Sequence, residues 1–127
     1  MEVGGRRASR ATGAPHDRSN VHAPDLALAR ACLAGDAEAH ARFDSELGEF
    51  LRLGVRRIRS DPAFVEETVQ QLRARLLIGA DAKLATYSGT GPLRAWLQLV
   101  ASRAALDASR AEARRRRYEH AAGDGAA

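Results

Sequence analysis

Apolar residues recur at helical spacing in four stretches of the chain, a pattern that predicts four helices. The first stretch begins at Pro24-Asp25 and ends at Gly35. Asp25 is expected to cap this short helix, because an aspartate side chain accepts hydrogen bonds from the free backbone amides of a first turn. Gly35 is a natural stop, since glycine tolerates the left-handed backbone that ends many helices. The apolar side of the helix consists of Leu26, Ala29 and Leu33.

The second and third stretches are longer and carry clear start signals. Asp36 is expected to cap the second helix, whose apolar positions are Phe43, Leu47, Phe50, Leu51 and Ile58. Asp61-Pro62 starts the third helix, because proline suits the first helical position after a capping carboxylate. Gly79 ends this helix. Its apolar residues, three or four positions apart, are Val65, Val69, Leu72 and Leu76.

The fourth stretch follows a turn and a loop. Asp81 is expected to cap a short turn that reaches Ala85, and residues 87–91 predict an exposed loop because they contain two glycines. Pro92 then opens a long helix. Its inward residues are Leu93, Trp96, Leu97, Val100 and Ala104. Its opposite face carries Arg103, Asp107, Arg110 and Arg114.

These elements predict an all-α fold, a small bundle of about four helices. The helical domain is expected to span residues 24–117, between a disordered leader (1–23) and a disordered tail that begins at Tyr118. The composition agrees, because the apolar fraction of 45% is rich in alanine and the aromatic fraction is only 5%. Strands prefer β-branched and aromatic residues, whereas alanine favours helices.

The single cysteine and the lack of long apolar runs limit where the chain can reside. Cys32 has no second cysteine to pair with, so an intrachain disulfide is excluded. No apolar run approaches the roughly 20 residues that a membrane span requires. The arginines of the N-terminus are not followed by the apolar stretch of a secretory signal. We therefore expect a cytoplasmic protein without a membrane partner.

The net charge of +4 is distributed unevenly along the chain. Residues 25–81 hold eight arginines and ten acids, a balance of −2. Residues 82–117 hold Lys83 and seven arginines but only Asp107 and Glu112 as acids, a balance of +6. This difference indicates two surfaces with different partners, of which the basic one should prefer a polyanion. An ordinary solvated set of helices is the alternative.

The chain contains no arrangement of residues that is typical of an active site. Its histidines are scattered, at positions 16, 22, 40 and 120, and no pair has the spacing of zinc ligands. Cys32 lies among apolar residues, which favours a small buried side chain over a nucleophile. Gly89 and Gly91 form neither a phosphate-binding loop nor a dinucleotide fingerprint. We expect no metal, no cofactor and no enzymatic activity.

Two segments resemble conserved region 2 of extracytoplasmic-function sigma factors. Residues 64–77 (FVEETVQQLRARLL) resemble the helix by which that family binds core polymerase. Residues 91–110 (GPLRAWLQLVASRAALDASR) are similar to its promoter-reading helix, F-R-x-W-L-x-x-I-A-x-N-x-x-x-D-x-x-R. The positions in register are Leu93, Arg94, Trp96, Leu97, Val100, Ala101, Asp107 and Arg110. The resemblance covers roughly residues 25–117.

The resemblance implies a transcription initiation factor that binds the clamp coiled coil of core RNA polymerase. The residues that match this surface are Glu66, Glu67, Gln70, Gln71 and Arg73. Arg52 and Arg56 on the preceding helix are weaker candidates. An ordinary solvated helix face is the alternative. Gln70-Gln71 replaces the usual Gln-Glu pair, and Leu72-Arg73 stands where an aromatic residue is expected.

The resemblance also implies that the chain recognises and melts the minus-ten element of promoter DNA. The loop that would hold an unstacked base contains Lys83, Tyr87, Ser88 and Thr90. The arginines expected to contact phosphates are Arg94, Arg103, Arg110 and Arg114. Tyr87 could instead be a packing residue, and Trp96 is expected in the core, since it shares the face of Leu93 and Val100. Arg103 stands where the family has asparagine.

Only ten residues follow Arg117, so the second domain of the family, region 4, is expected to be missing. The chain would then be a fragment or a truncated product, or it would act with a separate region-4 protein.

Three functional hypotheses follow from these residues, of which the transcription initiation factor is the first. The first alternative is a protein-interaction module that binds polymerase or an anti-sigma factor without recognising DNA. The second is a basic helical DNA binder unrelated to polymerase.

Overall fold

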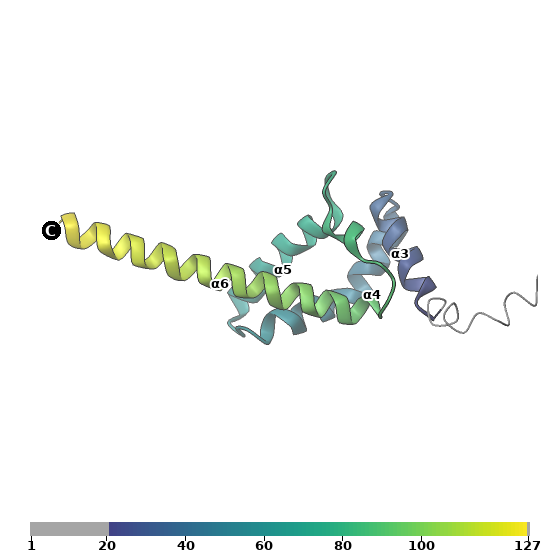
Figure 1. Ribbon diagram of the computed structural model, residues 1–127, viewed down its shortest axis with the longest axis horizontal. Helices are drawn as coiled ribbons and strands as arrows, with labels where there is room; N and C mark the ends of the chain where they lie inside the picture. The colour runs from purple at the N-terminus through teal and green to yellow at the C-terminus, as the bar shows by residue number, and fades with distance from the viewer. Residues whose placement is uncertain (1–20, 127) are drawn as a thin grey trace, which may run out of the picture.

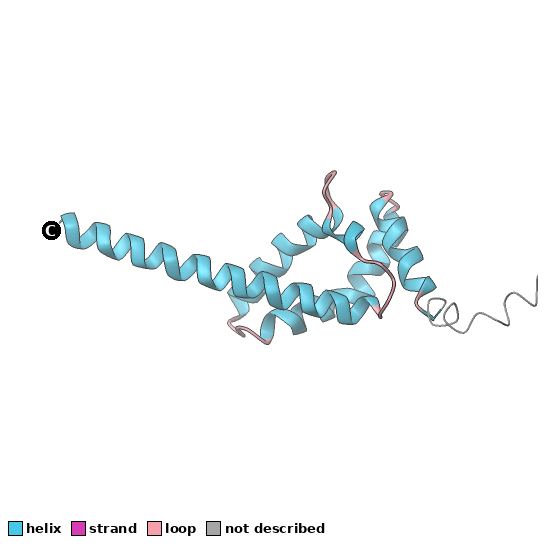
Figure 2. Cartoon of the chain, viewed as in Figure 1, coloured by secondary structure: helices cyan, strands magenta, loops and turns pink. Residues whose placement is uncertain are grey.

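The protein is an all-helical bundle in this computed structural model, which describes residues 21–126. The described residues form four α-helices, arranged as in Figure 1, one short 3₁₀ helix and no strand (Figure 2). The elements are α3 (Ala23–Leu33), α4 (Ala37–Arg56), α5 (Pro62–Leu77), η1 (Lys83–Thr86) and α6 (Leu93–Ala126). None of the described helices is both long enough and apolar enough to cross a bilayer. Residues 1–20 of the expected leader lie outside the described part.

The predicted starts of α4 and α5 are confirmed by their caps. The Asp36 side chain accepts a hydrogen bond from the Glu38 amide at 3.0 Å, and the Asp61 side chain accepts one from the Phe64 amide at 3.1 Å. Gly35, with φ of 85°, follows α3, and Gly79, with φ of 95°, follows α5. Both glycines therefore hold the left-handed backbone that was expected of helix stops.

Asp25 caps a different helix from the one predicted. Helix α3 already begins at Ala23, after His22, so Asp25 lies inside its first turn. The Asp25 carboxylate instead accepts a hydrogen bond from the backbone amide of Leu93, the first residue of α6, at 2.8 Å. An amide at a helix start has no hydrogen-bond acceptor within its own helix. The Asp25 carboxylate accepts this hydrogen bond from the Leu93 amide, although the two residues are 68 positions apart in sequence. The predicted cap at Asp81 is also wrong, because η1 has no side-chain cap.

Replacing Asp25 with alanine should therefore destabilise the whole bundle and not α3 alone. We expect Asp25→Ala to lower the free energy of unfolding by about 1 kcal/mol, the usual effect of removing a capping carboxylate. Asp81→Ala is the control, because Asp81 is exposed and caps nothing, and it should change stability by less than about 0.5 kcal/mol. Urea denaturation of the two variants measures the difference. Equal stabilities would contradict the cap.

The core lies between the four α-helices and η1, and α4 crosses α6 within it. Its largest fully buried side chains are Phe43, Leu51, Val55, Leu72, Leu76, Leu84, Leu93, Leu97 and Cys32. The predicted apolar stripe of α5 is buried throughout. At the crossing, the Ser102 hydroxyl donates a hydrogen bond to the Gly54 carbonyl at 2.7 Å. Ile58 is an error of the prediction, because α4 ends at Arg56 and Ile58 is 39% exposed. Leu33, at the end of α3, is also exposed.

Helix α6 is longer than predicted. It continues to Ala126, whereas the sequence indicated that helical structure ends near Tyr118. The alanines at positions 121 and 122 favour the helical state, which the glycines around them obscured in the sequence. The ion pair between Arg59 and Glu112 joins α6 to the segment after α4. From Arg114 to Gly123 every residue is exposed, and this end of α6 extends away from the bundle (Figure 1).

Candidate nucleic-acid interface

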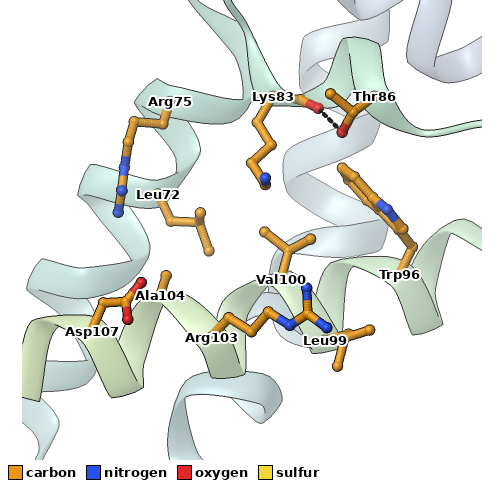
Figure 3. Close-up of a pocket in the computed structure, with 10 residues that line it drawn as sticks. All are labelled: Leu72, Arg75, Lys83, Thr86, Trp96, Leu99, Val100, Arg103, Ala104 and Asp107. Atoms are coloured by element: carbon orange, nitrogen blue, oxygen red, sulfur yellow. Dashed lines mark hydrogen bonds between the residues drawn. The ribbon is translucent and has the colours of Figure 1, made fainter.

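A cavity of about 410 Å³ opens between α5, η1 and α6. Figure 3 shows the ten residues that line it: Leu72, Arg75, Lys83, Thr86, Trp96, Leu99, Val100, Arg103, Ala104 and Asp107. Its floor is apolar, because Leu72 and Val100 are core residues. Its rim is charged. A site with an apolar floor and a cationic rim suits a ligand that combines a planar or apolar body with negative charge.

Three cations from three different elements surround this cavity. Arg75 comes from α5, Lys83 from η1 and Arg103 from α6, and all three are exposed. None of them forms an ion pair within residues 21–126. Figure 3 shows the Lys83 side chain extending toward the floor and Asp107, the one carboxylate of the rim, on the side of Arg75. Cations without carboxylate partners on the protein are available to phosphates.

Two further exposed arginines of α6 lie beyond the cavity, on the side of the helix that carries Arg103. Arg110 and Arg114 follow Arg103 by seven and eleven residues and are exposed. At about 100° per residue these intervals bring all three side chains to within about 20° of one direction. The same geometry corrects the prediction for Arg94. Arg94 precedes Arg103 by nine residues, a rotation of about 180°, so it is exposed on the opposite side of α6.

The loop before α6 is less exposed than predicted, and its tyrosine is buried. Tyr87 is only 5% exposed, its ring centre lies 5.5 Å from that of Trp96, and its hydroxyl donates a hydrogen bond to the Gly91 carbonyl at 2.5 Å. Burial raises the pKa of Tyr87 above its ordinary value. Gly89 is buried against Leu26 of α3. Tyr87 is therefore a packing residue, and it is not available to stack on a base.

The other loop residues of the predicted site remain on the surface. Ser88 and Thr90 are both exposed, and their hydroxyl oxygens lie 3.1 Å apart. They offer hydrogen bonds to a nucleotide but no stacking surface. Trp96 is half-buried, packs against the core and contributes to the cavity wall. A ligand in the cavity could therefore stack on or pack against the Trp96 ring.

On α5, two of the five predicted polymerase-binding residues are engaged with α4. Arg52 donates to Glu66 at 3.0 Å, and Arg73 donates to Asp44 at 2.6 Å. The hydrogen bond from Arg52 lowers the pKa of the Glu66 carboxyl, so this pair is ionised at neutral pH. The second weaker candidate of α4, Arg56, pairs with Glu49 within its own helix.

The remaining three residues form the outward face of α5. Glu67, Gln70 and Gln71 are all exposed, and the Gln71 amide donates to Glu67 at 3.4 Å. Arg75 follows Gln71 by one helical turn, so this face borders the cationic cavity. The sequence interpretation did not assign Arg75 to the site. Its position between Leu72 and Leu76 of the buried stripe is the signal that places it at the margin facing α6.

The described residues contain no cluster of three or more potential metal ligands. Cys32 is buried, as expected, and burial raises the pKa of its thiol. Comparison with protein-family models, with curated proteins and with solved structures gives no match.

Proposed function

We propose that this chain is a cytoplasmic transcription initiation factor that binds core RNA polymerase through α5 and promoter DNA through the cavity and α6. The observation that carries the proposal is a set of three cations around one open cavity, which form no ion pair in the described part of the chain and are in line with further exposed arginines of α6. Arg75, Arg103 and Arg110 lie on the two helices that contain the sigma-like segments, and Lys83 lies on η1 between these helices. Had Arg103 and Arg110 been buried, the proposal would have lost its DNA-binding surface.

The division of labour between the two surfaces follows from their charges. The outward face of α5 presents two carboxamides and one carboxylate, which suit hydrogen bonding to a protein partner. The cavity and the α6 arginines present guanidinium and ammonium groups, which suit phosphates. An unstacked base would enter the cavity against Trp96 and the apolar floor, while Lys83 and Arg103 hold the flanking phosphates. The minus-ten element is the expected target.

The decisive experiment combines purified core polymerase with this chain on promoter DNA, with a region-4 partner supplied and withheld. We expect initiation at specific promoters only when the chain is present. Arg110→Glu should weaken promoter binding roughly tenfold, because a phosphate contact becomes a repulsion, whereas core binding should be unchanged. Arg30→Glu, the same change at an exposed position of α3, is the control. Undiminished promoter binding by Arg110→Glu at low salt would refute the DNA-binding role.

A second candidate function is a protein-interaction module that binds polymerase or an anti-sigma factor without recognising DNA. The burial of Tyr87 favours it, because the loop then lacks the aromatic platform that base capture commonly uses. Co-purification with core polymerase, together with a complete lack of promoter-dependent opening, would select this alternative.

A further inference from the structure

Arg115 lines a small cavity with Phe64 and Glu67 of α5, and beyond it the end of α6 packs against none of the described helices. From Arg114 to Gly123 all side chains are exposed, and Figure 1 shows this segment beyond the rest of the bundle. A helix in a protein is normally stabilised by packing one apolar face against its neighbours. Among residues 114–123, Tyr118 is the one large side chain with apolar character, and it is 79% exposed. The segment therefore has no apolar face to offer.

Its charge is distributed around the whole helix. Residues 114–117 are four consecutive arginines, and at about 100° per residue they point in four directions that cover the circumference. Arg114 and Arg117 lie about 60° apart, on the side of Arg103 and Arg110. Arg115 and Arg116 lie on the opposite side, together with Glu119, the single acid of residues 114–123, which follows them by four and three residues. None of the four forms an ion pair in the part of the chain that the structure describes.

This arrangement excludes several partners on physical grounds. A flat acidic protein surface would contact one side of the helix and leave the other cations unused. An anionic membrane binds helices that carry an apolar face opposite the charges, and this segment has none. Clustered arginines also repel one another, which weakens the helix until a polyanion neutralises them. The partner must therefore carry negative charge on more than one side of the helix.

We propose that residues 114–123 of α6 lie in the major groove of double-stranded DNA. The major groove of B-DNA is about 12 Å wide, admits an α-helix and has phosphates along both walls. Arg114 and Arg117 then face one wall, and Arg115 and Arg116 face the other. The segment is about 15 Å long, so it spans about half a turn of duplex. The proposal rests on the DNA-binding half of the proposed function and adds a contact to duplex beside the melted region.

Two double variants test the two sides separately. We expect Arg114→Gln/Arg117→Gln and Arg115→Gln/Arg116→Gln each to reduce the salt dependence of binding to a 20-base-pair duplex by about 1.8 in the slope of log K against log salt, since each phosphate contact contributes about 0.9. Glutamine has nearly the helix propensity of arginine, so the fold is kept. Arg30→Gln/Arg57→Gln removes the same charge from exposed positions of the bundle and should leave the slope unchanged. Fluorescence anisotropy of labelled duplex between about 50 and 200 mM salt provides the slopes.

The outcomes distinguish binding in the major groove from one-sided contact with DNA, from binding to RNA and from binding to a membrane. An effect of the Arg114/Arg117 variant alone means a one-sided contact and overturns the proposal, as does an equal effect of the bundle control. Equal binding to an RNA duplex also overturns it, because the major groove of A-form RNA is too narrow for a helix. Stronger binding to anionic phospholipid vesicles than to DNA would assign the segment to a membrane instead. Polymerase-dependent initiation is measured separately, so its failure and the failure of the groove contact are distinguishable.

Discussion

Gly54→Ala is expected to destabilise the protein strongly, although alanine is the better helix former. A Cβ at position 54 would lie 2.4 Å from the Gln98 carbonyl oxygen and 2.7 Å from the Ala101 Cβ, both on α6. The first contact is with backbone, so α4 and α6 would have to separate. Overpacking of this kind typically costs 1–3 kcal/mol, and we expect a loss of about 3 kcal/mol in the free energy of unfolding. For a domain of this size the melting temperature should fall by roughly 15 °C.

Gly48→Ala is the matched control on the same helix. The nearest atom to a Cβ at position 48 is the flexible end of Arg52, at 3.7 Å. The substitution should therefore stabilise the protein by about 0.5–1 kcal/mol, through helix propensity alone. Opposite signs for the two variants in thermal denaturation would establish the close crossing of α4 and α6. A stabilising Gly54→Ala would mean that the helices are farther apart than described.

The largest expected effect on binding comes from Lys83→Ala combined with Arg103→Ala. Each removes an exposed cation that forms no ion pair within residues 21–126, so the fold should be unaffected. A hydrogen bond to a charged group contributes about 1.5–3 kcal/mol. Losing two such contacts should weaken binding of promoter DNA by at least about 100-fold. The single tryptophan, Trp96, lines the cavity, so its fluorescence reports ligand entry directly.

Asp107→Asn provides a control of opposite sign in the same cavity. Its carboxylate is the single negative group of the rim, and removing that charge should strengthen DNA binding a fewfold. Arg30→Ala with Arg57→Ala, on the bundle away from the cavity lining, should leave the affinity nearly unchanged. If the Lys83/Arg103 variant behaved like this bundle control, the cavity would have no role in binding.

Most features that depend on neighbouring residues were predictable from the sequence, although the local cap predicted at Asp81 is absent. The caps at Asp36 and Asp61 and the stops at Gly35 and Gly79 involve groups within a few positions, and each was predicted correctly. The buried stripe of α5 follows from its spacing alone. Such local signals specify the helices and their inward faces, and hence the all-α bundle.

Features that depend on distant residues were not predictable in this way. Asp25 resembles a local cap, but its partner is the start of α6. The burial of Tyr87 and Gly89 depends on Trp96 and on Leu26 of α3, which no pattern within residues 87–91 could reveal. Arg75 joins the site only because η1 and α6 come together beside α5. The error at Arg94 differs in kind, since counting helical turns along residues 94–103 would have prevented it.

The hydrogen bond from the Leu93 amide to Asp25 couples the stability of the start of α6 to that of α3. Local opening of α3 would release the Leu93 amide at the start of α6 and uncover Cys32 at the same time, because Cys32 is a buried residue of α3. Hydrogen exchange should therefore find that these two distant stretches lose protection together, as one cooperative unit. A protease or a partner that detaches α3 would in this way loosen the wall of the cavity that carries Trp96, without touching the cavity itself.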